Sequence, residues 1–164
     1  MDGKVADGEW SGPFLLSNGS GGSAWTVDPG SSEWAIKAYI PNKKDWNMWG
    51  VYIIRLRDKV DNSLIPNGRI LYIGGGQILE RTWLWNHYYL ENNKHTGRDL
   101  FNMWWNDNTQ PDYECLMMRL GTKELAKSAE KHLFYLCEQL FRIKAPFNTK
   151  WNPASDSRFS WPLI

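Results

Sequence analysis

The chain of 164 residues is long enough to bury one hydrophobic core and too short for two ordinary domains. Residues 37–150 hold seventeen Lys and Arg against twelve Asp and Glu, whereas residues 1–36 hold one Lys against five acidic residues. A basic body with an acidic leading segment is compatible with a partner that carries phosphates, and an ordinary solvated surface is the alternative interpretation.

Residues 1–44 are rich in Gly, Ser and Pro, and their short apolar patches predict turns that join short strands. The aromatic residues Trp10, Phe14, Trp25 and Trp34 indicate that this N-terminal arm packs on something, since a free linker would not need them. We expect the arm to contribute to recognition of a partner.

The remainder of the chain divides into a core over 45–152 and a C-terminal tail over 153–164. No apolar leader and no run of about 18 apolar residues is present, which predicts a soluble, cytoplasmic protein. Cys115 and Cys137 have no metal-ligand spacing around them, and we expect both to be small buried hydrophobes.

Regular elements begin near Trp49. The segments 50–57 and 69–74 are rich in β-branched and aromatic residues and have turn formers between them, which predicts an antiparallel hairpin. Helices are expected within 77–92 and 98–107, a third strand over 113–120, and a last helix after Thr122. The order predicts an α/β (α+β) fold, with a small three-stranded antiparallel sheet flanked by helices.

The last helix has the clearest pattern. Thr122 is a plausible N-cap, and Pro146 is expected to end the helix. One apolar stripe is predicted along it, formed by Leu125, Ala129, Leu133, Leu136 and Leu140.

The segments Gly50-Val51-Tyr52 and Leu71-Tyr72-Ile73-Gly74 resemble the paired motifs of the GIY-YIG nuclease superfamily, with Val51 where the family usually has Ile. Arg81 follows nine residues after the second Tyr, and Glu130 and Asn148 come later in the order that the family shows. The resemblance spans roughly residues 49–152. It implies a GIY-YIG-like core of the restriction or homing endonuclease type.

In the resembled family the first Tyr acts as general base or activates the attacking water, a role that falls to Tyr52. Tyr72 would bind the water or the scissile phosphate, and Arg81 would clamp that phosphate with its planar guanidinium. Glu130 would hold a single Mg²⁺ or Mn²⁺ ion. The motif glycine Gly74 and, further on, Asn148 are expected at the substrate.

A free phenol titrates near ~10, so Tyr52 needs a cationic neighbour or a metal-bound water to act near neutrality. Lys59, Arg55 and Arg69 are the candidates, and the family pattern does not choose among them.

Two further roles stay open. Glu138 rivals Glu130 as the metal ligand, but at about 100° per residue Glu130 flanks the apolar stripe while Glu138 points to solvent, so we favour Glu130. Many family members carry a His or Tyr four residues after the Arg, where this chain has Trp85. Either His87 or Tyr88 takes that role or the role is absent, and His87 is our choice.

The sequence thus predicts a metal-dependent, sequence-specific endonuclease that acts on double-stranded DNA, as a homodimer where the target is palindromic. A repair or toxin role for the same core is equally open. The alternative of another class is a non-catalytic module whose aromatic residues, among them eleven Trp, bind single-stranded nucleic acid or carbohydrate.

Overall fold

A computed structural model of the protein describes residues 8–16, 48–59, 65, 69–77 and 113–163. The helices predicted within residues 77–107 fall in the segment 78–112, which lies outside the described residues. The described part contains four strands and one helix, so the α+β class is confirmed for it.

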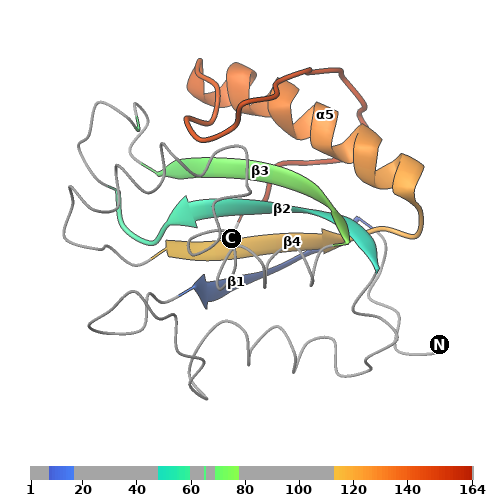
Figure 1. Cartoon of the computed structure of the whole chain (residues 1–164), viewed down its shortest axis with the longest axis horizontal. Helices are drawn as coiled ribbons and strands as arrows, with labels where there is room; N and C mark the ends of the chain where they lie inside the picture. The colour runs from blue at the N-terminus through green and yellow to red at the C-terminus, as the bar shows by residue number, and fades with distance from the viewer. Residues whose placement is uncertain (1–7, 17–47, 60–64, 66–68, 78–112, 164) are drawn as a thin grey trace.

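The strands form one open antiparallel sheet in the order β1-β4-β2-β3 (Figure 1). Their bounds are Trp10–Leu16 for β1, Trp49–Leu56 for β2, Ile70–Gln77 for β3 and Tyr113–Arg119 for β4. The predicted hairpin is confirmed, because β2 and β3 pair antiparallel.

The predicted number of strands was wrong, because β1 adds a fourth strand from the N-terminal arm to the sheet. The register of β1 against β4 shifts between Ser11 and Phe14, where Gly12 and Pro13 interrupt the strand. An edge strand tolerates such an interruption, because only one of its sides is paired. The Gly/Pro content that predicted turns therefore does not exclude a strand here.

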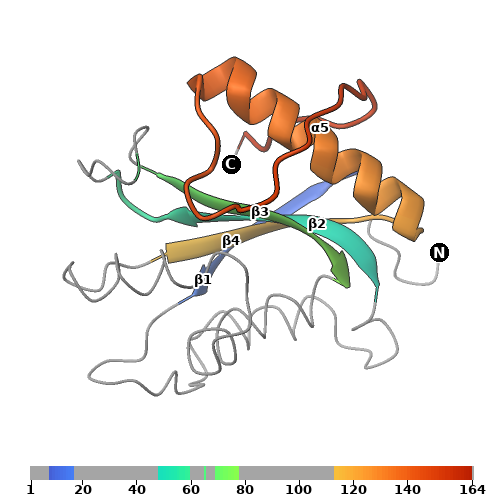
Figure 2. The same ribbon diagram turned by 45° about the horizontal axis from the view of Figure 1, so that its top comes forward.

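The hydrophobic core lies between the sheet and helix α5, which spans Lys123–Phe141 and crosses one face of the sheet (Figure 2). Strand β2 is central, and its residues from Gly50 to Leu56 are all buried. Because side chains alternate along a strand, Val51 and Ile53 join the cluster beneath α5 while Tyr52 faces the other way.

The predicted N-cap of α5 is confirmed, since the Thr122 hydroxyl accepts a hydrogen bond from the Leu125 amide at 3.2 Å. The helix ends before Pro146, contrary to the prediction. Arg142 takes a left-handed conformation (φ 61°), and its amide donates to the Glu138 carbonyl at 2.9 Å. This cap, and not the proline, terminates the helix.

The predicted apolar stripe of α5 is displaced around the helix. The residues that face the sheet include Ala126, Ala129, Leu133 and Cys137, whereas Leu140 is 55% exposed. The small alanines at the N-terminal half let the helix approach the sheet closely. Among the described residues no helix is long and apolar enough to span a membrane.

The segment after α5 runs back over the same face of the sheet (Figure 2). Phe159 is buried in the core, and Trp161 meets Phe141 edge-on at 5.4 Å between ring centroids. The Trp10 indole donates to the Ser160 carbonyl at 2.7 Å. Residues of the predicted arm and of the predicted tail therefore pack on the predicted core.

Both cysteines are free and buried, which confirms the expectation from the sequence. Burial, and to a lesser degree the nearby Glu138 charge, raises the pKa of the Cys137 thiol from 9.0 to about 12. We predict that neither thiol of the native protein reacts with a disulfide reagent at pH 8, and that both react in denaturant; rapid labelling of the native protein would contradict this burial.

The same shift has a consequence for stability. Between pH 9 and 12 the Cys137 thiol loses its proton in the unfolded chain and keeps it in the folded one, so its contribution to the free energy of unfolding is present below pH 9 and decreases as the pH rises. A Cys137→Ala variant lacks this titration and is the control in alkaline unfolding curves.

Candidate functional site

The two motif tyrosines lie on one face of the sheet and touch. Tyr52 pairs with Gly74 across the hairpin and Ile54 pairs with Tyr72, so Tyr52 and Tyr72 are diagonal neighbours. Their rings are stacked, with centroids 6.1 Å apart and planes at 29°. Tyr52 is 2% exposed and Tyr72 is half-buried. The structure thus brings together the two predicted tyrosines.

Gly74 provides the space that the Tyr52 ring occupies. A Cβ atom at residue 74 would lie 2.4 Å from Tyr52 Cζ and 2.5 Å from its hydroxyl oxygen. Any side chain at this position would overlap the ring. Gly74 therefore positions Tyr52. This contact alone explains why residue 74 is glycine, without the predicted contact between Gly74 and the substrate.

Glu130 comes from α5 and approaches the next residue of the same strand. Its carboxylate oxygen Oε2 lies 3.0 Å from the position that a Cβ atom of Gly75 would take. Glu130 is half-buried, and its side chain lines a cavity of about 280 Å³ together with Gly75 and Gly76. The glycines thus let a helix carboxylate reach the backbone of β3.

Tyr52 and Glu130 approach β3 from opposite faces of the sheet, because the Cβ directions of successive strand residues alternate. Consecutive Cα atoms are 3.8 Å apart, so the two glycine contacts limit the separation between Tyr52 Oη and Glu130 Oε2 to about 12 Å. The predicted base and the predicted metal ligand therefore lie on opposite faces of one edge strand.

Asn148 holds the chain that follows α5 against this edge. Its Oδ1 accepts from the Ile73 amide at 2.9 Å, and its Nδ2 donates to the Ile73 carbonyl at 2.8 Å. The Phe147 amide donates to the Leu71 carbonyl at 3.1 Å. Asn148 therefore pairs like one residue of a further strand, which places it beside the motif residues and gives it a structural role.

The cavity at Glu130 also contains residues that the sequence did not single out. Lys123 and Lys127 line it from α5 and Trp49 from the start of β2, and the Lys123 Nζ lies 5.7 Å from the centroid of the Trp49 ring. Residues 123, 127 and 130 follow the i, i+4, i+7 spacing of one helix face. That spacing is the signal that identifies them from the sequence.

The rival carboxylate Glu138 has different surroundings. It lies eight residues further along α5 and accepts a hydrogen bond from the Trp151 indole at 2.6 Å. It is half-buried, so the expectation that it points to solvent was wrong; Trp151, which also packs on Phe134 at 4.3 Å between ring centroids, covers it. Of the two glutamates, Glu130 is the one beside the glycines of β3.

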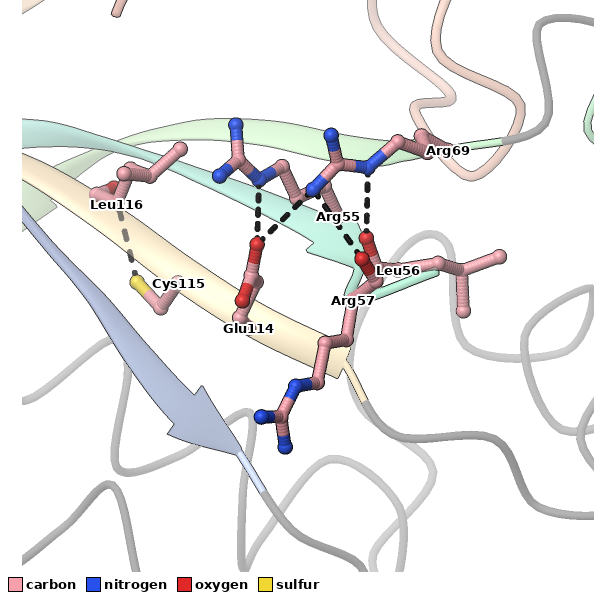
Figure 3. Close-up of polar contacts among 7 residues, drawn as sticks. All are labelled: Arg55, Leu56, Arg57, Arg69, Glu114, Cys115 and Leu116. Carbon is pink, nitrogen blue, oxygen red and sulfur yellow. Dashed lines mark hydrogen bonds and ion pairs between the residues drawn. The ribbon is translucent and has the colours of Figure 1, made fainter. Parts of the chain in front are cut away.

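Two of the predicted cationic partners of Tyr52 bind a buried glutamate instead (Figure 3). Arg55 Nε and Arg69 Nη2 both donate to Glu114 Oε1, at 2.8 and 3.1 Å. Arg69 Nε also donates to the Leu56 carbonyl at 3.0 Å. Arg55 faces the α5 side, opposite to Tyr52, because the two are an odd number of residues apart.

The third candidate, Lys59, is exposed three residues beyond the end of β2. Leu56, where Arg69 is bound, lies about 13 Å along β2 from Tyr52. The structure does not bring Lys59, Arg55 or Arg69 beside Tyr52.

Arg81 and His87 lie outside the described residues, as do Trp85 and Tyr88. Comparison of the chain with protein-family models, with curated proteins and with solved structures found no match in any of the three. The resemblance to the GIY-YIG superfamily therefore rests on the motif residues themselves.

The residues at Glu130 fit a hydrated divalent cation. Among the described residues that line this cavity Glu130 is the one carboxylate, and Lys123 and Lys127 lie in the same lining. Mg²⁺ is commonly bound by one or two carboxylates with water and phosphate oxygens as its other ligands. Six water molecules occupy roughly 180 Å³, which the cavity of about 280 Å³ accommodates.

The two glycines are predicted to respond differently to alanine. Gly74→Ala forces the Tyr52 ring out of a packed position, and we expect it to lower the free energy of unfolding by about 1–3 kcal/mol. Gly75→Ala meets only the mobile end of Glu130, and its cost is expected to be well below that of Gly74→Ala. Urea unfolding of the two variants measures this, and equal losses would argue against the Tyr52 contact.

The Glu114 cluster is predicted to be structural. Glu114→Gln removes the charge that compensates Arg55, whose side chain is 10% exposed, and we expect a loss of about 3 kcal/mol. Arg69→Gln should cost about 1 kcal/mol or less, because its side chain is 37% exposed. Chemical denaturation distinguishes these values, and a Glu114→Gln variant as stable as the parent would contradict the assignment.

Proposed function

We propose that the protein is a metal-dependent DNA endonuclease that hydrolyses phosphodiester bonds. The observation that carries the proposal is that Tyr52 and Glu130 approach adjacent glycines of β3, Gly74 and Gly75, from opposite faces of the strand. A phosphodiesterase must activate water and neutralise charge on the phosphoryl oxygens. A phenol on one side of an edge strand and a carboxylate in a cavity on the other provide one group for each task.

Each residue of the proposed site has a separate role. Glu130 would hold a Mg²⁺ or Mn²⁺ ion, and the ion would supply positive charge that stabilises the phosphoryl oxygens and favours ionisation of water. Tyr52 would accept a hydrogen bond from the attacking water at its phenol oxygen and orient that water, whose proton leaves to solvent. Tyr72, in contact with the Tyr52 ring, orients that water or the phosphate through its hydroxyl, and Arg81 clamps the phosphate.

Asn148 supports this arrangement indirectly. By pairing with both backbone groups of Ile73, it fixes the strand immediately before Gly74 and Gly75. A shift of about 1 Å in the reacting groups is enough to slow a reaction substantially. His87 completes the proposed site as a proton donor to the leaving group.

The proposed substrate is double-stranded DNA, cut at a specific sequence in the manner of a restriction enzyme. One site of this kind cuts one strand, so cleavage of both strands of a palindromic target uses a homodimer. Because β1 is part of the sheet, recognition of the target sequence is proposed for the other residues of the N-terminal arm.

The alternative of an aromatic binding module gains little from the described tryptophans. Trp10, Trp151 and Trp161 pack against the core, and Trp49 lines the cavity at Glu130. Three of these four therefore contribute to folding. Among the residues that the structure describes, the tryptophans therefore do not favour stacking on sugars or single-stranded bases over the nuclease.

The proposal predicts cleavage that depends on a divalent metal. Purified protein incubated with plasmid DNA of mixed sequence should cut in Mg²⁺ and not in EDTA. We expect Tyr52→Phe, Arg81→Ala and Glu130→Gln each to lower the cleavage rate by about 10²–10³, because each removes one group that acts on the reacting atoms.

Glu124→Gln is the matched control, because Glu124 is an exposed glutamate in the first turn of the same helix and should leave cutting unchanged. Loss of cutting in Glu138→Gln, with Glu130→Gln active, would transfer the metal to Glu138. Binding of DNA or glycan with no cutting of any DNA would overturn the nuclease and support the binding module.

A further inference from the structure

We infer that Lys123 and Lys127 form a subsite for the sugar-phosphate backbone of the nucleic acid next to the cleaved bond. The inference rests on the proposed function for the identity of the substrate. It rests on the cavity at Glu130 for its geometry, since both lysines line the same cavity as Glu130, Gly75 and Trp49.

The helix spacing matches the substrate. From Lys123 to Glu130 the axis of α5 rises by about 10 Å. One strand of DNA advances 3.4 Å per nucleotide, so this length corresponds to roughly three nucleotides. A strand whose scissile phosphate lies at Glu130 can therefore run along α5 and bring its neighbouring phosphates to Lys127 and then Lys123.

The two lysines are available for a phosphate. Both are exposed, and among the residues that the structure describes neither forms an ion pair. Arg55 and Arg69, by contrast, are bound to Glu114. Lys123 lies over the face of Trp49, which restrains its ammonium group toward the cavity.

The chemistry limits what this subsite reads. A lysine ammonium is a point charge that binds phosphate without recognising bases. The subsite therefore raises affinity equally for all sequences, and recognition of a target sequence belongs elsewhere in the chain. Its contribution depends on salt, because each phosphate that is neutralised releases condensed counterions.

The test is the salt dependence of binding to a labelled DNA duplex by the full chain in EDTA, where no cutting occurs. The slope of log K against log salt is negative, and each lost phosphate contact reduces its magnitude by about 0.9. The magnitude for Lys123→Gln/Lys127→Gln should therefore be about 1.8 smaller than for the parent. From 50 to 200 mM salt the parent then loses roughly tenfold more affinity than the variant. Lys123→Arg/Lys127→Arg should retain the parental slope.

The control is Lys144→Gln/Lys150→Gln, which removes the same charge from exposed positions outside the cavity and should keep the parental slope. An equal decrease in both double variants, or none in Lys123→Gln/Lys127→Gln, would overturn the subsite. In Mg²⁺, the Lys123→Gln/Lys127→Gln variant should reach half of its maximal cleavage rate at a higher protein concentration than the parent. Its cleavage rate at saturating protein should equal that of the parent.

The two proposals fail separately. Cutting by the parent with an unchanged slope in Lys123→Gln/Lys127→Gln overturns the subsite and leaves the nuclease. A decreased slope in that variant, with no cutting by the parent in Mg²⁺, overturns the nuclease and supports the phosphate subsite.

Discussion

Strand β3 carries no side chain over three consecutive residues, from Gly74 to Gly76, and both halves of the candidate site occupy the space that this leaves. The Tyr52 ring fills the volume beside Gly74 on one face, and the Glu130 carboxylate reaches Gly75 on the other. A side chain at residue 74 would displace the phenol, and one at residue 75 would press on the carboxylate. The close approach of the Tyr52 ring and of the Glu130 carboxylate to strand β3 depends on these glycines.

A strand with three glycines gains little from its own side chains, so its position has to be fixed from outside. On its inner side β3 pairs with β2, which is buried along almost its whole length. On its outer side Asn148 and Phe147 donate to and accept from the backbone of Leu71 and Ile73. The pairing on both sides stops the strand from shifting just before the glycines.

The parts of the site that the sequence predicted correctly are those set by local spacing. The predicted hairpin is confirmed by the pairing of β2 with β3, and the register of that pairing places Tyr52 and Tyr72 on one face. Thr122 as N-cap depends only on the residues that follow it. The choice of Glu130 over Glu138 as metal ligand stays a prediction, because the stripe on which it rested is displaced and Glu138 is covered by Trp151.

The parts that the sequence did not predict depend on tertiary contacts. Short strands were predicted in the N-terminal arm, but the sequence did not predict that β1 pairs with β4 as a fourth strand of the sheet. Leu140 belongs to the predicted stripe, yet the rotation of α5 is set by how closely Ala126 and Ala129 approach the sheet. Glu138 is covered by Trp151, which comes from the segment after the helix and returns to it only in the folded protein.

The distribution of positive charge also depends on tertiary contacts and not on proximity in the sequence. Arg55 and Arg69 are close to the tyrosine motifs in sequence, but in the fold they balance one buried carboxylate at the far end of β2 (Figure 3). Lys123 and Lys127 are 49 and 53 residues beyond the end of the second motif at Gly74, and both line the cavity at Glu130. A net charge of +1 therefore does not argue against a phosphate partner, because the field that a substrate meets is set by which cations are neutralised inside the fold and which remain at its surface.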